Sequence, residues 1–255
     1  MAYNKIVTEG GGGVTSCLGM RLNGAVKFFE EHGKFPDAID SSKQFFIYED
    51  YSGQNVSKEI IGSYSKPDKK IYTSFEPGWQ FSWYDQIKLP ELSILSREIC
   101  PMSVAVGNKS YEMMNQLDGR TALLYRGNDK ALDIPRTHYQ GMIQMALDSE
   151  SEKFIVQTDE NNFYDFFKER FPDTICFDEV PRIDKDPDAY VMPELGKRVE
   201  FCINFLAAIR AISQAPKLIL NTGNTGLWTM FFRGHTKDVW QIQGQNQQWR
   251  KLNNI

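Results

Sequence analysis

The sequence predicts an α/β protein whose helices cover both faces of mostly parallel sheets. Short apolar runs of strand length alternate with segments whose apolar residues recur every three or four positions, and turn residues separate the two. Runs such as 122–125 and 218–220 are apolar throughout, which is typical of a strand buried on both faces. At 255 residues, with 41% hydrophobic and 24% charged residues, the chain is long enough for one large domain or two small ones.

The amino-terminal half is predicted to begin with a strand, a glycine loop and a helix. Residues 5–8 form the expected strand, residues 10–13 are glycines, and the helix spans about 15–31 with Thr15 or Ser16 as its N-cap. The helix is indicated by apolar residues at helical spacing: Leu18, Leu22, Val26 and Phe29.

Gly11, Gly12 and Gly13 are candidate ligand-binding residues. Glycines let the backbone approach a ligand closely, and the helix that follows presents free N–H groups and a positive dipole end to an anion. The run lacks both the G-x-G-x-x-G spacing of a dinucleotide site and the Gly-Lys-Ser/Thr of a P-loop. A mobile turn is therefore the alternative interpretation.

Residues 35–40 are the expected second strand, whereas residues 41–100 follow no clear periodicity. Aromatic residues crowd part of this segment among prolines and glycine, and they suit either a sugar-stacking surface or a core beneath long loops. They are Tyr72, Phe75, Trp79, Phe81, Trp83 and Tyr84.

Strands and helices alternate more regularly in the second half. The expected strands are 122–125, 153–157, 174–177 and 217–220, and the expected helices are 110–117, 137–147, 162–171, 195–214 and one that begins near Thr225. We place a domain boundary near 100–120, because proline and glycine interrupt the pattern there. The expected domains are 1–115 and 116–235, and residues 236–255 are expected to pack back on the first domain.

Composition excludes several classes of function. A net charge of -4 and a pI near 5.5 argue against a nucleic-acid partner, since that binding needs basic surface. The amino terminus is too short and polar for a signal peptide, and no apolar run has the length of a membrane span. The four cysteines are scattered, so we expect reduced thiols in a cytoplasmic protein and no structural zinc site.

Arg126 is the first candidate for an anion-binding residue. It follows the apolar run 122–125 and would lie at the carboxyl end of a parallel strand, the edge at which open α/β sheets bind ligands. A planar guanidinium also suits a diphosphate, because it donates parallel charge-assisted hydrogen bonds. The alternative is an ordinary strand-end arginine paired with Asp129.

Three motifs occur in the same order and spacing as in a known family. They are LYRGNDK at 124–130, FIVQTDE at 154–160 followed by a phenylalanine-rich helix and RFP at 170–172, and LILNTGNTG at 218–226 followed by LW. Together they resemble the donor-binding domain of the α1,6-fucosyltransferase and nodulation fucosyltransferase group. The chain departs from that pattern at Leu124, where the family has histidine, and at Gly127, where it has a second arginine. Asn224 and Thr225 stand where it has a serine pair.

The resemblance implies a GT-B-like fold, in which two Rossmann-like domains with parallel sheets bind a nucleotide-sugar in the cleft between them. It implies an inverting glycosyltransferase that needs no metal or other cofactor and transfers fucose, or a related deoxyhexose, from a GDP-sugar donor to a glycan acceptor. The donor would be held by the glycine loop, Arg126, Asp159 and the turn that contains Thr222, Gly223, Asn224 and Thr225. Asp159 is expected to bind the base or ribose, with a helix N-cap as the alternative role.

A direct displacement also needs a base for the proton of the acceptor hydroxyl. Asp133 is the candidate, although a solvent-exposed loop acid is the simpler interpretation, and His138 is expected to be structural.

A rival enzyme would be a metal-dependent UDP-sugar glycosyltransferase that uses Asp184-Lys185-Asp186 as a D-x-D clamp. The non-enzyme alternative is a nucleotide-sugar or glycan-binding module that keeps the fold without activity.

Overall fold

The computed structural model describes residues 3–10, 12–45, 48, 56–127, 139–184, 196–243 and 247–255. The helices are α1 Val14–His32, α2 Val56–Ile60, α3 Leu89–Ile99, α4 Val104–Met114, α5 Tyr139–Asp148, α6 Asn161–Arg170, α7 Arg198–Ile212 and α8 Asn224–Arg233, with 3₁₀ helices η2 Lys69–Ile71 and η3 Pro77–Phe81. The strands are β1 Lys5–Val7, β2 Ala38–Asp40, β3 Thr121–Tyr125, β4 Phe154–Thr158, β5 Thr174–Ile175, β6 Leu218–Asn221, β7 Val239–Ile242 and β8 Trp249–Lys251.

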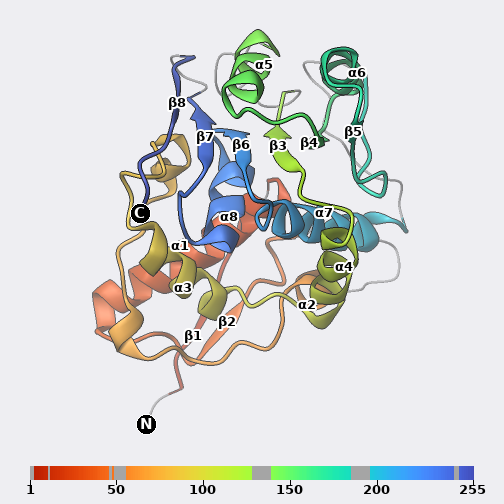
Figure 1. Cartoon of the computed structure of the whole chain (residues 1–255). Helices are drawn as coiled ribbons and strands as arrows, with labels where there is room; N and C mark the ends of the chain where they lie inside the picture. The colour runs from red at the N-terminus through yellow and green to blue at the C-terminus, as the bar shows by residue number, and fades with distance from the viewer. Residues whose placement is uncertain are drawn as a thin grey trace.

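The strands form one large sheet and one small sheet (Figure 1). The large sheet has six strands in the order β5-β4-β3-β6-β7-β8, and each pair is parallel except β7 with β8. The small sheet pairs β1 with β2 in parallel. The expected α/β class with mostly parallel strands is confirmed.

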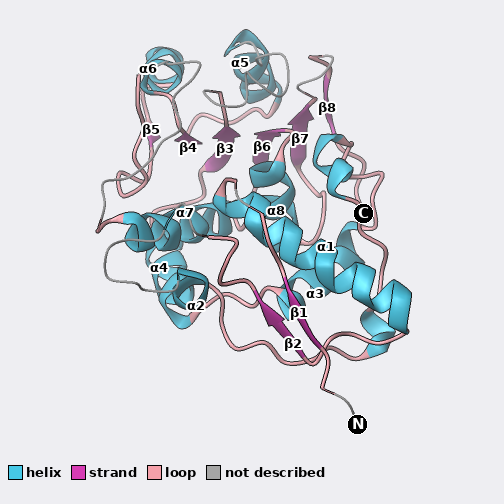
Figure 2. Ribbon diagram, turned by 180° about the vertical axis from the view of Figure 1, so that it is seen from behind, coloured by secondary structure: helices cyan, strands magenta, loops and turns pink. Residues whose placement is uncertain are grey.

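Helices cover both faces of the large sheet (Figures 1 and 2). Leu123 and Tyr125 of β3 pack with α5 and α6 in one buried cluster, while Ala122 and Leu124 belong to the cluster that contains α7 and α8. Helices α1 and α3 in turn contact α8, and α4 packs on α7. Alternate residues of β3 therefore enter different cores, which explains why the run is apolar throughout.

The strand register aligns the ends that carry the candidate site. Tyr125 of β3 is paired with Thr158 of β4, and Leu124 is paired with Leu220 of β6. Because these strands are parallel, the residues that follow each of them leave the sheet at the same edge.

Sequence periodicity predicted most of the other elements, but it did not predict α2, α3, β7 or β8, and several predicted helices differ at their starts. Helix α1 begins at Val14 with Gly13 as its N-cap, so the expectation of Thr15 or Ser16 as the cap was wrong. Helix α4 begins at Val104 behind a Ser103 cap, earlier than we expected. Helix α3 lies in the segment that the periodicity left undecided, and Pro90 stands in its first turn, where the missing N–H costs little.

The aromatic segment 72–84 contributes to the core. Phe75 and Tyr84 are buried, and Tyr72, Trp79 and Trp83 are partly buried hydrophobic residues that pack against the same cluster. The interpretation as a core beneath long loops therefore describes this segment better than an open stacking surface.

The cysteines are all free thiols. No described helix is long and apolar enough to cross a membrane.

The proposed domain boundaries stay predictions. The small sheet is formed by residues before 115 in the sequence and the large sheet by residues after it. One core cluster, however, includes residues from both halves. Among the described residues, the first half has a two-stranded sheet, smaller than the Rossmann-like sheet that a GT-B likeness implies. Residues 236–255 supply β7 and β8 to the large sheet, and they also reach the first half, where Arg250 lies 2.7 Å from Asp85.

Gly226, in the first turn of α8, is a position where even one methyl group should destabilise the fold. A Cβ atom there would lie 2.5 Å from the backbone oxygen of Asn221 and 3.0 Å from the Tyr84 hydroxyl. We expect Gly226→Ala to lower the free energy of unfolding by about 1–3 kcal/mol, measured by urea denaturation. Gly78→Ala is the control, because a Cβ there has no atom within 4 Å. Equal stability of the two variants would contradict this packing account.

Candidate functional site

Residues at the carboxyl ends of β3, β4 and β6 contact one another at one edge of the large sheet. The backbone N–H of Arg126 donates to the Asn221 side-chain oxygen at 3.3 Å, and the Asn221 amide nitrogen donates to the Arg126 carbonyl at 3.0 Å. The backbone N–H of Gly127 donates to a carboxylate oxygen of Asp159 at 3.0 Å. Two predicted site residues, Arg126 and Asp159, are thus brought together, and Asn221 connects them to the turn after β6.

Arg126 is held by an ion pair with Asp159. Its Nε lies 3.0 Å from Asp159 Oδ2, and the side chains of Arg126 and Asp159 are 22% and 8% exposed. The guanidinium also lies over the Phe205 ring of α7, 6.0 Å from its centroid. The carboxylate therefore fixes the direction of the guanidinium while part of the arginine stays open to solvent.

The structure corrects one interpretation of these residues and adds a partner to the other. Asp159 does not cap α6: the N-cap is Glu160, whose side chain makes no capping hydrogen bond. Arg126 pairs with Asp159, whereas Asp129, the partner considered from sequence, lies outside the described residues. The Arg126–Asp159 pair is largely buried. Arg126 is therefore not an exposed arginine at the end of a strand, as the simpler interpretation had it.

The turn after β6 is fixed by contacts with the first half of the chain. Gly223 has a φ of 137°, a conformation that side-chain-bearing residues rarely adopt. Its N–H donates to Gln80 at 2.9 Å, and its carbonyl accepts from the Tyr84 hydroxyl at 3.2 Å. Burial raises the pKa of Tyr84, so its hydroxyl stays protonated and able to donate. The Thr222 N–H is also used, because it donates to Ile242. The amides of Thr222 and Gly223 therefore hold the turn.

The first turns of α1 and α8 lie side by side. The Thr15 and Thr225 hydroxyl oxygens are 3.4 Å apart, and the Asn224 side chain donates to the Ser16 hydroxyl at 2.7 Å. Gly13 precedes α1 and Gly223 precedes α8, and neither helix has an acidic residue in its first turn. Two positive helix ends thus meet without a carboxylate from those turns.

Five first-turn amides of the two helices make no hydrogen bond to a described residue. They are the backbone N–H groups of Val14, Thr15, Asn224, Thr225 and Gly226. Such orphan donors at helix N-termini are suited to bind an anion. Within the predicted turn, the N–H donors that remain for a ligand therefore belong to Asn224 and Thr225. Position 226 has room only for glycine, because Asn221 and Tyr84 pack closely against it.

The glycine loop leads directly into this pair of helix ends. Gly12 has a φ of 150°, and Gly13 is the N-cap of α1. Gly11 lies outside the described residues. The contact between α1 and α8 therefore places the described part of the loop next to the turn after β6, as the predicted site requires.

A buried carboxylate explains why residue 127 is glycine. A Cβ atom on Gly127 would lie 2.2 Å from Glu160 Oε1 and 2.7 Å from the Tyr125 ring. Glu160 is fully buried and accepts a hydrogen bond from the Tyr139 hydroxyl. An arginine at position 127 would not fit unless these groups moved. Sequence reasoning missed Glu160 and Tyr139, although an acidic residue directly after Asp159 at a strand end was a usable signal.

Other candidates lie wholly or partly outside the described residues. Asp133, the candidate base, is among them, as are His138 and the last two residues of the Asp184-Lys185-Asp186 motif. Within the described ranges, no group of three or more His, Cys, Asp or Glu residues is placed to hold a metal ion.

The Arg126–Asp159 pair should be energetically coupled. We expect Arg126→Met to destabilise the protein by about 1–3 kcal/mol, because it removes the guanidinium that pairs with a nearly buried carboxylate. Adding Asp159→Asn should recover part of that loss. The double-mutant cycle is measured by urea denaturation, with the exposed pair Lys251–Asp238 as the control, for which we expect coupling below about 1 kcal/mol. Strictly additive effects at 126 and 159 would refute the coupling.

Searches with the sequence found neither a matching family model nor a matching curated protein. The fold, however, matches solved structures over its whole length. A crystal structure of NodZ α-1,6-fucosyltransferase soaked with GDP-fucose has a TM-score of 0.60 and 12% identity, covering 99% of this chain and 100% of that one. Fucosyltransferase NodZ from Bradyrhizobium has a TM-score of 0.60 and 10% identity over the full length of both chains. NodZ co-crystallised with GDP has a TM-score of 0.56 and 11% identity, with 99% of each chain covered. The chain therefore has the GT-B-type fold of the NodZ fucosyltransferase.

Proposed function

We propose that the protein is a glycosyltransferase that transfers fucose, or a related deoxyhexose, from a GDP-sugar to a glycan acceptor. The observation that carries this proposal is the meeting of two helix N-termini, α1 and α8, beside the sheet edge that holds Arg126. The likeness to NodZ structures that contain GDP or GDP-fucose supports the same ligand class. Neither argument depends on the other, since one rests on local geometry and the other on the path of the backbone.

A diphosphate suits this arrangement electrostatically. Each helix end carries about half a positive charge, so two adjacent ends repel each other unless an anion lies between them. The first-turn amides of Val14, Thr15, Asn224 and Thr225 supply donors, and Arg126 adds a guanidinium that its ion pair with Asp159 orients. A nucleoside diphosphate would satisfy all of these groups together.

The same groups would favour bond cleavage. As the glycosidic bond to the donor breaks, negative charge accumulates on the leaving diphosphate, and fixed N–H dipoles with a guanidinium stabilise that charge. Asp159 would keep Arg126 oriented before the donor arrives, which lowers the cost of reorganisation. We propose a direct displacement with inversion at the anomeric carbon and without a metal ion, and Asp133 remains the proposed base.

One observation favours a binding module without turnover. The motif positions that depart from the family, Leu124 and Gly127, are integrated into the packing: Leu124 is 1% exposed, and Glu160 occupies the space beside Gly127. A protein that kept the anion site and lost the other family groups would bind GDP-sugars without transferring the sugar.

Donor assays separate these functions. The purified protein is incubated with GDP-fucose, other GDP-sugars and UDP-sugars, each with a set of glycan acceptors, with and without EDTA. Turnover of a GDP-sugar that EDTA does not affect supports the proposal. GDP-sugar binding without turnover supports the module, and UDP-sugar turnover that EDTA abolishes would refute both.

Arg126→Lys should weaken GDP binding by about tenfold or more, because lysine keeps the charge but loses the planar fork that donates parallel hydrogen bonds. Calorimetry with GDP measures the effect. Arg120→Lys is the matched control: Arg120 directly precedes β3, at the opposite end of the strand, and pairs with Asp173 at 2.9 Å. Unchanged affinity in the Arg126 variant, or an equal loss in both variants, would remove Arg126 from the site.

A further inference from the structure

A cavity lies beside the small sheet, and its lining contains no residue of the proposed donor site. It has a volume of about 380 Å³ and opens to solvent. Residues of β1, β2, α1 and the segment 57–64 line it, and they include Lys5, Arg21, Asp40, Lys58 and Tyr64. This cavity, here named the β2-edge pocket, is therefore distinct from the edge that holds Arg126.

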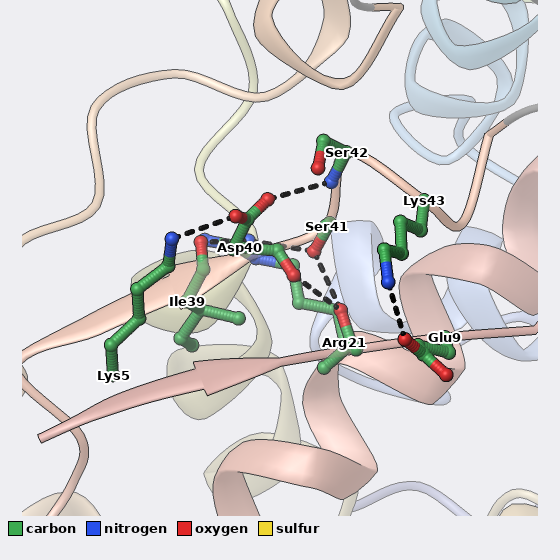
Figure 3. A network of polar contacts seen from close by, with 9 residues as sticks. Lys5, Glu9, Arg21, Ile39, Asp40, Ser41, Ser42 and Lys43 are labelled. Carbon is green, nitrogen blue, oxygen red and sulfur yellow. Dashed lines mark hydrogen bonds and ion pairs between the residues drawn. The ribbon is translucent and has the colours of Figure 1, made fainter.

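Arg21 is the unusual residue of the β2-edge pocket. Arg21 is only 3% exposed, yet no carboxylate of a described residue lies within ion-pair distance of its guanidinium. Nε donates to the Ile99 carbonyl at 2.8 Å, and Nη1 donates to the Ile39 carbonyl at 3.1 Å and the Ser41 hydroxyl at 2.9 Å (Figure 3). Nη2 donates to no oxygen of a described residue. Burying a charge without a counter-charge is costly, so this position favours an anionic ligand.

The other charges of the pocket leave an excess of cations. Lys5 pairs with Asp40 at 2.8 Å, and the backbone N–H of Ser42 donates to the same carboxylate at 3.0 Å (Figure 3). The hydrogen bond from Lys5 holds the pKa of Asp40 below its usual range, so the carboxylate stays charged. Lys58 is exposed and has no ion-pair partner among the described residues. Asp40 is thus neutralised by Lys5, while Arg21 and Lys58 remain uncompensated.

The pocket also offers uncharged contacts to a polar ligand. Its lining residues include Tyr3, Tyr64, Ser41 and Ser57. Arg21 lies against the Tyr64 ring, 5.7 Å from its centroid, so the guanidinium is held from that side too. The volume is near the lower end of the range for small-molecule sites, about 300–1,000 Å³.

We propose that the β2-edge pocket binds an oxyanion group, a carboxylate or a phosphate ester, of a small polar ligand. Arg21 would supply a preoriented guanidinium and Lys58 a mobile ammonium, the pair of donors that oxyanions favour. The protein as a whole carries a net charge of -4, so the excess of positive charge in the pocket does not reflect the overall charge of the chain. The inference does not depend on the proposed transferase activity.

Titrations with glucuronate and with glucose 6-phosphate test the proposal and show which oxyanion is preferred. Binding is measured by calorimetry at constant ionic strength, with glucose as the uncharged comparison. We expect at least one anion to bind, and Lys58→Ala and Arg21→Lys to weaken that binding by about tenfold. Lys43→Ala is the matched control, because Lys43 pairs with Glu9 on the surface and does not line the pocket.

GDP competition separates the two sites, and circular dichroism verifies that the Arg21 variant is folded. Saturating GDP should leave binding of the anionic sugar intact. Displacement by GDP, affinity equal to that of glucose, or an Lys58 variant that binds like the Lys43 variant would each overturn the proposal. If the Arg21 variant fails to fold, the comparison of the Lys58 and Lys43 variants decides the question alone.

Discussion

The polar part of the candidate site depends on the position of β3 between β4 and β6. Parallel pairing on both sides brings the ends of three strands to one edge, where Arg126, Asp159 and Asn221 contact one another. The strand supports this arrangement because its side chains enter cores on both faces, so a shift in its register would misplace buried residues on each side. The enclosed apolar part of the strand therefore fixes where the polar edge begins.

Contacts between the halves of the chain complete the site. Helix α1 from the first half meets α8 from the second at their N-termini, and Gln80 and Tyr84 hold the turn before α8 through Gly223. The energetic conflict between two positive helix ends is tolerated because the surrounding packing is extensive, and a bound anion would relieve it. Stability and ligand affinity are therefore linked at this point: a GDP-bound protein should resist unfolding more than the free protein.

Sequence reasoning succeeded where local pattern decides the outcome and failed where tertiary contacts decide it. Apolar runs and helical spacing identified β3, β4, β6 and α8, and the strand-end rule placed Arg126 and Asp159 at one edge. The ion pair itself was missed, because residues 126 and 159 are separated by a helix. The packing role of Gly226 could not be predicted either: its neighbour Tyr84 comes from a segment without periodicity, and no sequence pattern reveals such an approach. The burial of Arg21 in α1 was also not predicted, because it depends on contacts with other segments.

Chemical-shift mapping with ¹⁵N-labelled protein tests the central claim, that the meeting of α1, α8 and the β3 end binds a nucleoside diphosphate. Titration with GDP should move the backbone amide signals of Thr15, Gly127, Asn224 and Thr225, because these groups lie in or beside the proposed diphosphate site. Amides in the β2-edge pocket, such as that of Lys58, should stay unchanged. Shifts confined to the pocket or to other surfaces, with the four site amides unmoved, would contradict the account.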